Sequence, residues 1–476
     1  MNDHTRRLGL RSHSGAVAPF VGKQTGNSGR HGLAWNLTLA MFVILFVGDL
    51  LSGIGLVPQI APDLALLAVQ FALLLYAIAQ TTRYRTALRV PGLKPVAVLL
   101  GVVLVSALLN GQGIAEIIVF VRAMIGQYIV LIVMVNLGLS DWELKKLNRL
   151  IFALCAIQIP VAFYRMLTSG NDVFLAGGTR SFGTEAATGT LARAGGSLGV
   201  TFPLIVIGFL LAFYLWKPKK TYLAWMLGFV FFSYCTGKRA FAFVLPLYIV
   251  ALYWLIGRGV FISKKVIILG LIGVFAFIGG LSLHPSLNPS GKIGGKIDIV
   301  YAVKKAIDYE TGVTWEAKTA GRYTTSKHLI ELALDDGLLI FLFGSGPSTM
   351  MKSGLIDSNF YNKLSMIDVS YGITGAGWIF SQIGLLGLLF FLGLLTFFFR
   401  RTLRIRKTLR DPYWHAVCGG LIAFHLVIFY DTIAYSTTCV SGKLLPALYW
   451  FFLAQVLLRN KATKYQITPN AVQRTF

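Results

Sequence analysis

Residues 372–399, GITGAGWIFSQIGLLGLLFFLGLLTFFF, run for 28 positions without a charged side chain. A helix of about 20 apolar residues is long enough to cross the roughly 30 Å hydrocarbon core of a bilayer. A helix that is apolar on all sides is typical of a membrane span or of a fully buried core. The stretch therefore predicts a membrane-spanning helix, and it raises the question of how many more the chain contains.

The composition of the whole chain agrees with a membrane protein. Of 476 residues, 55% are hydrophobic and only 13% are charged, with a mean hydropathy of +0.69. A soluble domain carries about 25% charged residues. We therefore expect an all-α polytopic membrane protein of about 12 transmembrane helices. The expected spans are 34–56, 61–80, 94–110, 114–138, 150–168, 198–216, 221–236, 240–256, 265–283, 372–399, 413–436 and 442–458.

The spans divide the chain into five parts. A basic tail (1–33) precedes nine spans within 34–283, and a long loop (284–371) separates these from three spans within 372–458 and a final tail (459–476). The loop is the only sizeable polar portion. Within it, the segment containing Leu329, Leu332 and Leu334 predicts an amphipathic helix with these leucines on its apolar side.

The net charge of +25 could indicate a nucleic acid partner, but the distribution of the charge argues otherwise. If the N-terminus is cytoplasmic, most of the 44 Lys and Arg residues lie in cytoplasmic segments, as the positive-inside rule requires. We therefore expect both termini in the cytoplasm, the long loop outside, and no nucleic acid. We expect membrane lipid to surround the apolar helices.

The segment SYCTGKRAFAFVLPL (233–247) departs from this rule. Lys238 and Arg239 stand at the outer entrance of the eighth span, in a hairpin too short to excuse them. Long basic side chains can extend from a helix end to the interface without any further role. A contact with an anion is the alternative, and the sequence leaves both open.

Four more cations share this outer or intramembrane position. Arginine suits phosphate because its planar fork makes two parallel charge-assisted hydrogen bonds. Together the six predict a site for a lipid-linked phosphate or diphosphate, although anionic lipid headgroups would attract them too. Arg122 would lie about 12 Å deep in the fourth span, where it either pairs helices or contacts an anion. The six residues are Arg122, Arg165, Arg180, Lys238, Arg239 and Arg322.

Two residues are candidates for a general base. Asp368 stands just before the tenth span, where burial would raise the pKa of a carboxylate. His328 is the rival, because the unperturbed pKa of an imidazole already suits a general base. The chain has no metal-binding motif, and its four cysteines have no metal or disulfide spacing, so we expect neither a metal nor a cofactor.

These features together resemble the bacterial O-antigen ligase and O-antigen polymerase superfamily. TGKRAFAFVLPL, with Arg239, is similar to a family motif that enters a helix. The segment 320–350 is similar to the arginine-bearing helix of the family's long loop, with Arg322 followed by Gly344-x-Gly346. GGTRSFGTEAATG, with Arg180, loosely matches an arginine-glycine segment. Asp368 stands where ligases of the family carry a histidine, which favours the polymerase branch.

The resemblance implies a GT-C-like membrane fold and metal-independent, inverting glycosyl transfer at the periplasmic face of the bacterial inner membrane. It implies polymerisation of undecaprenyl-diphosphate-linked repeat units into O-antigen, capsule or exopolysaccharide. A chain-length regulator and a flippase would be partners. Catalysis would involve Arg239 and Arg322 with Asp368 or His328. A ligase that transfers glycan to lipid A core remains an alternative. A secondary transporter is a third hypothesis, against which stands the lack of inverted repeats.

Overall fold

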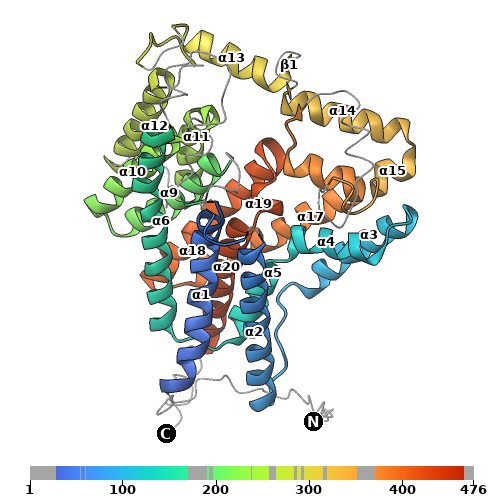
Figure 1. Cartoon of the computed structure of the whole chain (residues 1–476). Helices are drawn as coiled ribbons and strands as arrows, with labels where there is room; N and C mark the ends of the chain where they lie inside the picture. The colour runs from blue at the N-terminus through green and yellow to red at the C-terminus, as the bar shows by residue number, and fades with distance from the viewer. Residues whose placement is uncertain are drawn as a thin grey trace, which may run out of the picture.

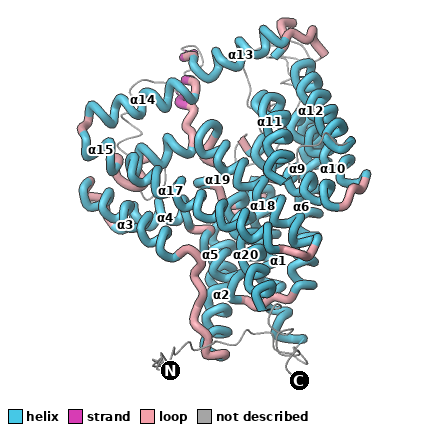
Figure 2. The backbone as a smooth tube through the Cα atoms, turned by 180° about the vertical axis from the view of Figure 1, so that it is seen from behind, coloured by secondary structure: helices cyan, strands magenta, loops and turns pink. Residues whose placement is uncertain are grey.

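Helices dominate the computed structural model of the chain, in which three short strands are the remaining regular elements of the described residues (Figure 1, Figure 2). The structure describes residues 28–53, 55–58, 60–169, 190–191, 197–236, 238–256, 264–283, 287–290, 294–314, 319–350 and 370–465. Of the predicted site residues, Arg180 and Asp368 lie outside these ranges.

The elements follow one another in a single series of mostly apolar helices. Those before the long loop are α1 (Ser28–Gly53), α2 (Ala61–Arg83), α3 (Leu93–Leu109), α4 (Ile114–Ile125), α5 (Tyr128–Asn136), α6 (Asp141–Ser169), α9 (Leu198–Trp216), α10 (Lys220–Cys235), α11 (Arg239–Ile256) and α12 (Lys264–Leu283). The later ones are α13 (Ile299–Thr311), β1 (Val313–Thr314), β2 (Thr319–Ala320), α14 (Arg322–Asp335), α15 (Leu338–Phe343), β3 (Ser370–Tyr371), α17 (Gly375–Thr408), α18 (Pro412–Tyr430), the π-helix η2 (Asp431–Tyr435), α19 (Thr438–Ser441) and α20 (Leu444–Tyr465).

Seven of these helices are long and apolar enough to cross a membrane, or up to eight if one bent pair counts as a single span. The chain is therefore a multi-pass membrane protein, as its composition predicts. A helix occupies each of the twelve expected ranges, but several are short, bent or continued by another helix. The number of twelve crossings stays a prediction.

The fourth expected span (114–138) is not one continuous helix. Its two parts, α4 and α5, meet at an angle of 64° at Gly126 and Gln127. Glycine is a common cause of a sharp helix kink, and the Gln127 side chain accepts a hydrogen bond from Gln70 Nε2 of α2 at 2.7 Å. Arg122 therefore lies in the last turn of α4, just before the bend, with a half-exposed side chain. The expectation of one straight span is wrong, whereas the depth of Arg122 in the membrane stays a prediction.

A second break interrupts α17, where Ile383 and Gly384 leave helical geometry. The turn after α15 fills this break. The backbone N–H groups of Ser345 and Gly346 donate to the carbonyls of Ser381 and Gln382 at 2.9 and 3.1 Å. The Gly-x-Gly motif of the loop is therefore a clamp that ties the long loop to the tenth expected span.

We expect Gly344→Ala to destabilise the fold by about 2 kcal/mol or more. Gly344 has a φ of 78°, and an added Cβ would lie 2.4 Å from the carbonyl carbon of Gln382. Gly101→Ala in α3 is the matched control, because no atom lies within 4 Å of its added Cβ. Thermal unfolding in detergent should show a lower midpoint for the first variant alone, and equal midpoints would contradict the clamp.

The two chain ends and the long loop lie at opposite ends of the molecule. In Figure 1, α1 begins and α20 ends near the lower edge, whereas α13 and α14 lie along the upper edge. There β2 pairs with β1 and, in parallel, with β3, which connects the loop to the start of α17. Both views show α13 bridging α9–α12 on one side and α14, α15, α3 and α4 on the other (Figure 2).

The amphipathic helix expected in the loop is present as α14, but its apolar side differs in part from the prediction. Thr325, Leu329 and Ala333 are buried, at the i, i+4, i+8 spacing of one helix face. Leu334 is 55% exposed because it lies about 140° around the helix from Leu329.

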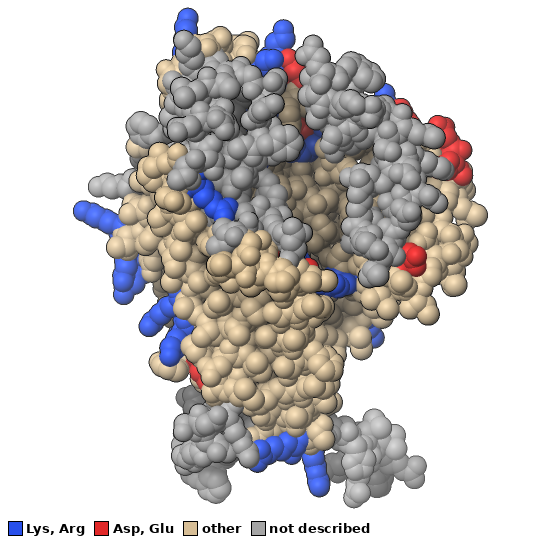
Figure 3. Space-filling model, viewed as in Figure 1, with Lys and Arg blue, Asp and Glu red and all other residues tan. Residues whose placement is uncertain are grey.

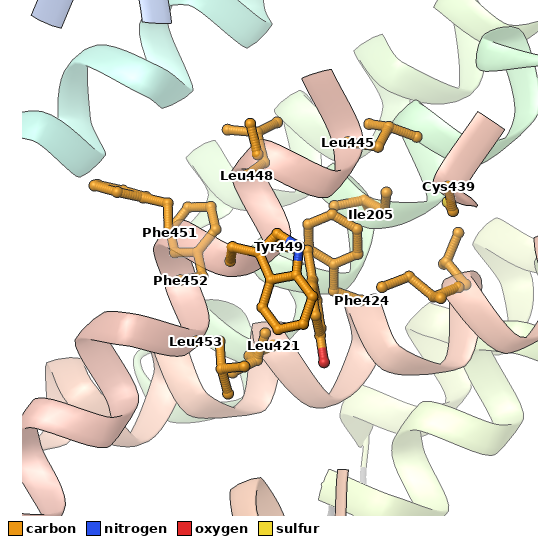
Figure 4. Close-up of a cluster of buried hydrophobic side chains, with 14 of the residues drawn as sticks. Ile205, Leu421, Phe424, Cys439, Leu445, Leu448, Tyr449, Phe451, Phe452 and Leu453 are labelled. Atoms are coloured by element: carbon orange, nitrogen blue, oxygen red, sulfur yellow. The ribbon is translucent and has the colours of Figure 1, made fainter. Parts of the chain in front are cut away.

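The core lies where α9, α18 and α20 meet. Phe424, Tyr449 and Phe451 are among its largest fully buried side chains (Figure 4). Tyr449 meets Phe424 edge to face, with ring centroids 5.7 Å apart. All four cysteines are buried and free, and they pack as small hydrophobic residues. The segment 431–443, which contains two residues of the candidate site, Asp431 and Tyr435, connects α18 and α20 of this core.

Candidate active site

Two of the predicted arginines meet at one aromatic ring. The guanidinium carbon of Arg239 lies 4.2 Å from the centroid of the Tyr309 ring, and that of Arg322 lies 5.9 Å from it. Arg239 comes from α11, Arg322 from α14, and Tyr309 from the bridging helix α13. The fold thus brings together two cations that are 83 positions apart in the chain.

Each of these arginines is the first residue of its helix. The N-terminus of a helix carries a partial positive charge, so a cation there is unfavourable in the absence of an anion. The free backbone N–H groups at such an end, together with the dipole, bind phosphate groups. Two helix starts and two guanidinium groups therefore form a place where a di-anion would be strongly favoured.

Arg322 is held in position by several partners. Its Nη1 donates to Glu310 Oε1 at 2.6 Å, its Nε donates to the Tyr435 carbonyl at 2.5 Å, and its guanidinium carbon lies 4.7 Å from the Tyr435 ring centroid. Burial alone would lower the pKa of Arg322, but Glu310 and the nearby tyrosines raise it above its ordinary value. The side chain is therefore a fixed, permanent cation.

Arg239 is much less engaged. Within the described part of the chain, its guanidinium makes no hydrogen bond or ion pair and only faces the Tyr309 ring. Stacking on an aromatic ring orients a guanidinium without using its five donors. Arg239 is thus oriented and able to donate to a ligand, whereas Arg322 uses two donor atoms to hold its own place.

A buried carboxylate, Asp431, lies next to this cluster. It begins the π-helix η2, which ends at Tyr435, the residue whose carbonyl Arg322 contacts. Asp431 is fully buried, and its Oδ2 accepts the backbone N–H of Cys439 at 2.6 Å. Its Oδ1 has no partner among the described residues. A buried polar atom without a partner is costly and rare in proteins, and π-helices are frequent at functional sites.

The sequence analysis missed Asp431, although a signal was present. It is the only charged residue between Pro412 and Gly442. An ionisable residue within an apolar span is a functional candidate by default, because its burial is expensive. Asp431 lies within the expected span 413–436, away from the outer segments in which the candidate acids were expected.

The other predicted cations are distributed more widely. Lys238 is half-buried and directly precedes Arg239 in the chain. Arg122 forms an ion pair with Asp63, with Nη2 and Oδ2 3.9 Å apart, in a separate group. Arg165 is half-buried near the end of α6, which packs mainly against α10 and α1.

His328 shares α14 with Arg322, six residues further along. That spacing places it about 9 Å away along the axis and about 120° around the helix. At this separation the two side chains point to different sides of α14, and one small ligand does not reach both.

The space-filling view shows the surroundings of these groups. A hollow lies between the α9–α12 side and the α14–α15 side, and Lys or Arg side chains are visible at its upper and lower margins (Figure 3). Among the described residues, no three His, Cys, Asp or Glu side chains gather as a set of metal ligands. The chemistry available at the cluster is that of fixed cations beside a buried carboxylate.

No protein-family model and no curated protein matches the chain. The fold and the site define a multi-pass membrane protein with a cationic cluster at one end of its helix bundle.

Proposed function

We propose that the protein is a glycosyltransferase that polymerises glycan repeat units carried on undecaprenyl diphosphate. The observation that supports this most is the convergence of Arg239 and Arg322, each at a helix start, on Tyr309. We place the cluster at the periplasmic face of a bacterial inner membrane, with both termini cytoplasmic and twelve crossings in a GT-C-like arrangement. The charge distribution of the sequence supports this orientation.

In this proposal the diphosphate of the donor lies between the two guanidinium groups and the starts of α11 and α14. The bond between the anomeric carbon and the diphosphate oxygen breaks, and the electron pair stays on the diphosphate. Fixed cations and helix ends stabilise this developing charge without reorganising. A hydroxyl oxygen of the acceptor sugar forms the new bond from the opposite face, which inverts the configuration.

The acceptor hydroxyl must lose its proton during this step. We assign Asp431 as the base for two reasons. Its Oδ1 has no hydrogen-bond partner among the described residues. The same π-helix, η2, ends at Tyr435, whose carbonyl accepts a hydrogen bond from Arg322. A positioned carboxylate that takes a proton contributes about 10²–10⁴-fold to a rate. Asp368 and His328 stay as predicted alternatives for this role.

Deletion of the gene, followed by analysis of the cell's glycans, tests the proposal against its rivals. A polymerase predicts the loss of long glycan and the accumulation of single repeat units on the lipid carrier. A ligase that acts on lipid A core predicts long glycan that remains on the carrier. A transporter predicts normal glycan with altered uptake. Either of the last two results would contradict the proposed function.

A further inference from the structure

A cavity of about 550 Å³ lies beside the segment that follows Asp431. Residues of α1, of the start of α2, of α19 and of the turn into α20 line it. This volume is within the range of about 300–1,000 Å³ that is usual for ligand sites. Tyr309, Arg239 and Arg322 are not among its lining residues, so the diphosphate site does not account for it.

The charges at this cavity compensate one another. Asp63 forms ion pairs with Lys443 and with Arg122, and Asp49 adds a second carboxylate to the lining. The formal charges of these four groups sum to zero. An anionic ligand would therefore have to compete with Asp63 for its cations, so the cavity suits a neutral polar ligand better than a second diphosphate.

Hydroxyl groups form the rest of its polar surface. Ser197, Thr437, Thr438 and Ser441 all line the cavity. The Thr438 hydroxyl is hydrogen-bonded to the hydroxyl of Ser197 and, at 3.0 Å, to that of Ser436. The lining thus combines carboxylates, an ammonium group and hydroxyls with leucine, isoleucine and proline side chains, and a sugar ring likewise presents both polar and apolar surface.

The cavity is also linked to Asp431. Thr438 lines the cavity, and the next residue, Cys439, donates its backbone N–H to the Asp431 carboxylate. Because Cys439 follows Thr438 directly, a sugar held by the Thr438 hydroxyl would lie beside the backbone that contacts Asp431.

We infer that this cavity binds the terminal neutral sugar of the acceptor repeat unit and that Asp63 accepts hydrogen bonds from its hydroxyls. This inference rests on the proposed function, since it separates an acceptor sugar site from the donor diphosphate site. The residues of α1, α2 and α19 that line the cavity would then determine which glycan the protein extends.

The test uses the full-length protein in detergent and two probes. One is undecaprenyl diphosphate. The other is the repeat-unit oligosaccharide released by mild acid from the lipid-linked precursor of the deletion strain. We expect Asp63→Asn and Ser441→Ala to weaken oligosaccharide binding about 10-fold, the loss that one good hydrogen bond accounts for. Binding of undecaprenyl diphosphate should remain unchanged. Glu331→Gln on α14, whose side chain is 54% exposed, is the matched control and should bind both probes like the wild type.

Three results are decisive. Unchanged oligosaccharide binding by Ser441→Ala, in a variant that unfolds at the wild-type temperature, would overturn the inference and leave the proposed function standing. Equal weakening of both probes would show that the cavity is not a separate sugar site. A deletion strain that accumulates no lipid-linked precursor would overturn the proposed function and this inference with it.

Discussion

Arg239→Lys and Arg322→Lys should each reduce glycan polymerisation at least about 100-fold, the usual effect of removing one fixed donor from a site of developing negative charge. Lysine keeps the positive charge, but it cannot make the two parallel hydrogen bonds of the guanidinium fork. For Arg322 the loss has a second cause, because lysine cannot contact Glu310 and the Tyr435 carbonyl at the same time as a ligand. The rate of polymer formation from lipid-linked repeat units by purified protein measures the effect.

Arg400→Lys is the matched control for this pair. Arg400 is an exposed residue in the distal part of α17, far along that helix from Gly375, which lies against the segment 431–441. It carries the same change in chemistry and should polymerise at the wild-type rate. Full activity of either Arg239→Lys or Arg322→Lys would contradict the assignment of the diphosphate site, provided that the variant is as abundant in the membrane as the wild type.

Asp431→Asn should reduce polymerisation by about 10²–10⁴-fold while the protein still binds undecaprenyl diphosphate. Asparagine has nearly the same shape, and its side-chain oxygen can still accept the hydrogen bond from Cys439. It cannot take a proton from the acceptor hydroxyl at a useful rate. Loss of a negative charge near Arg322 should leave the affinity for the diphosphate equal or greater.

This combination distinguishes the base from the cations. The arginine variants should lose both binding and activity, whereas Asp431→Asn should lose activity alone. Asp335→Asn, at the exposed end of α14, removes an acid elsewhere and should behave like the wild type. Wild-type activity of Asp431→Asn would rule out this residue as the base, and the same assay on Asp368→Asn and His328→Ala would then decide between the two remaining candidates.

The sequence predicted the class of fold well because apolar runs report directly on membrane spans. It could not predict the bends. Gln127 lies in an apolar run that is long enough to form one membrane span. The helix bends there, where Gln127 contacts Gln70 of α2, and this contact between distant parts of the chain cannot be read from the local sequence. Gly384 likewise lies within a continuous apolar run, and the turn that fills its break comes from a segment some forty residues earlier.

The candidate site was predicted only in part. Arg239 and Arg322 were singled out as cations expected on the outer side of the membrane, each in a stretch that resembles a family motif. Their convergence on Tyr309 depends on how α13 crosses between two groups of helices, which no local pattern encodes. Arg122 was placed with them because of its position within an expected span, and of its two open roles the structure shows the pairing of helices, through Asp63 of α2. Asp431 was recognisable as the only charged residue between Pro412 and Gly442, but it lies inside an expected span, whereas the site was expected on the outer segments.

In the proposed donor complex, one diphosphate lies between Arg239 and Arg322. A structure of the protein with undecaprenyl diphosphate bound, determined by electron cryomicroscopy, would test this placement. We expect phosphate oxygens within hydrogen-bonding distance of both guanidinium groups, beside the Tyr309 ring and at the starts of α11 and α14. A diphosphate bound at Arg122 and Lys443, or elsewhere away from Tyr309, would contradict this placement.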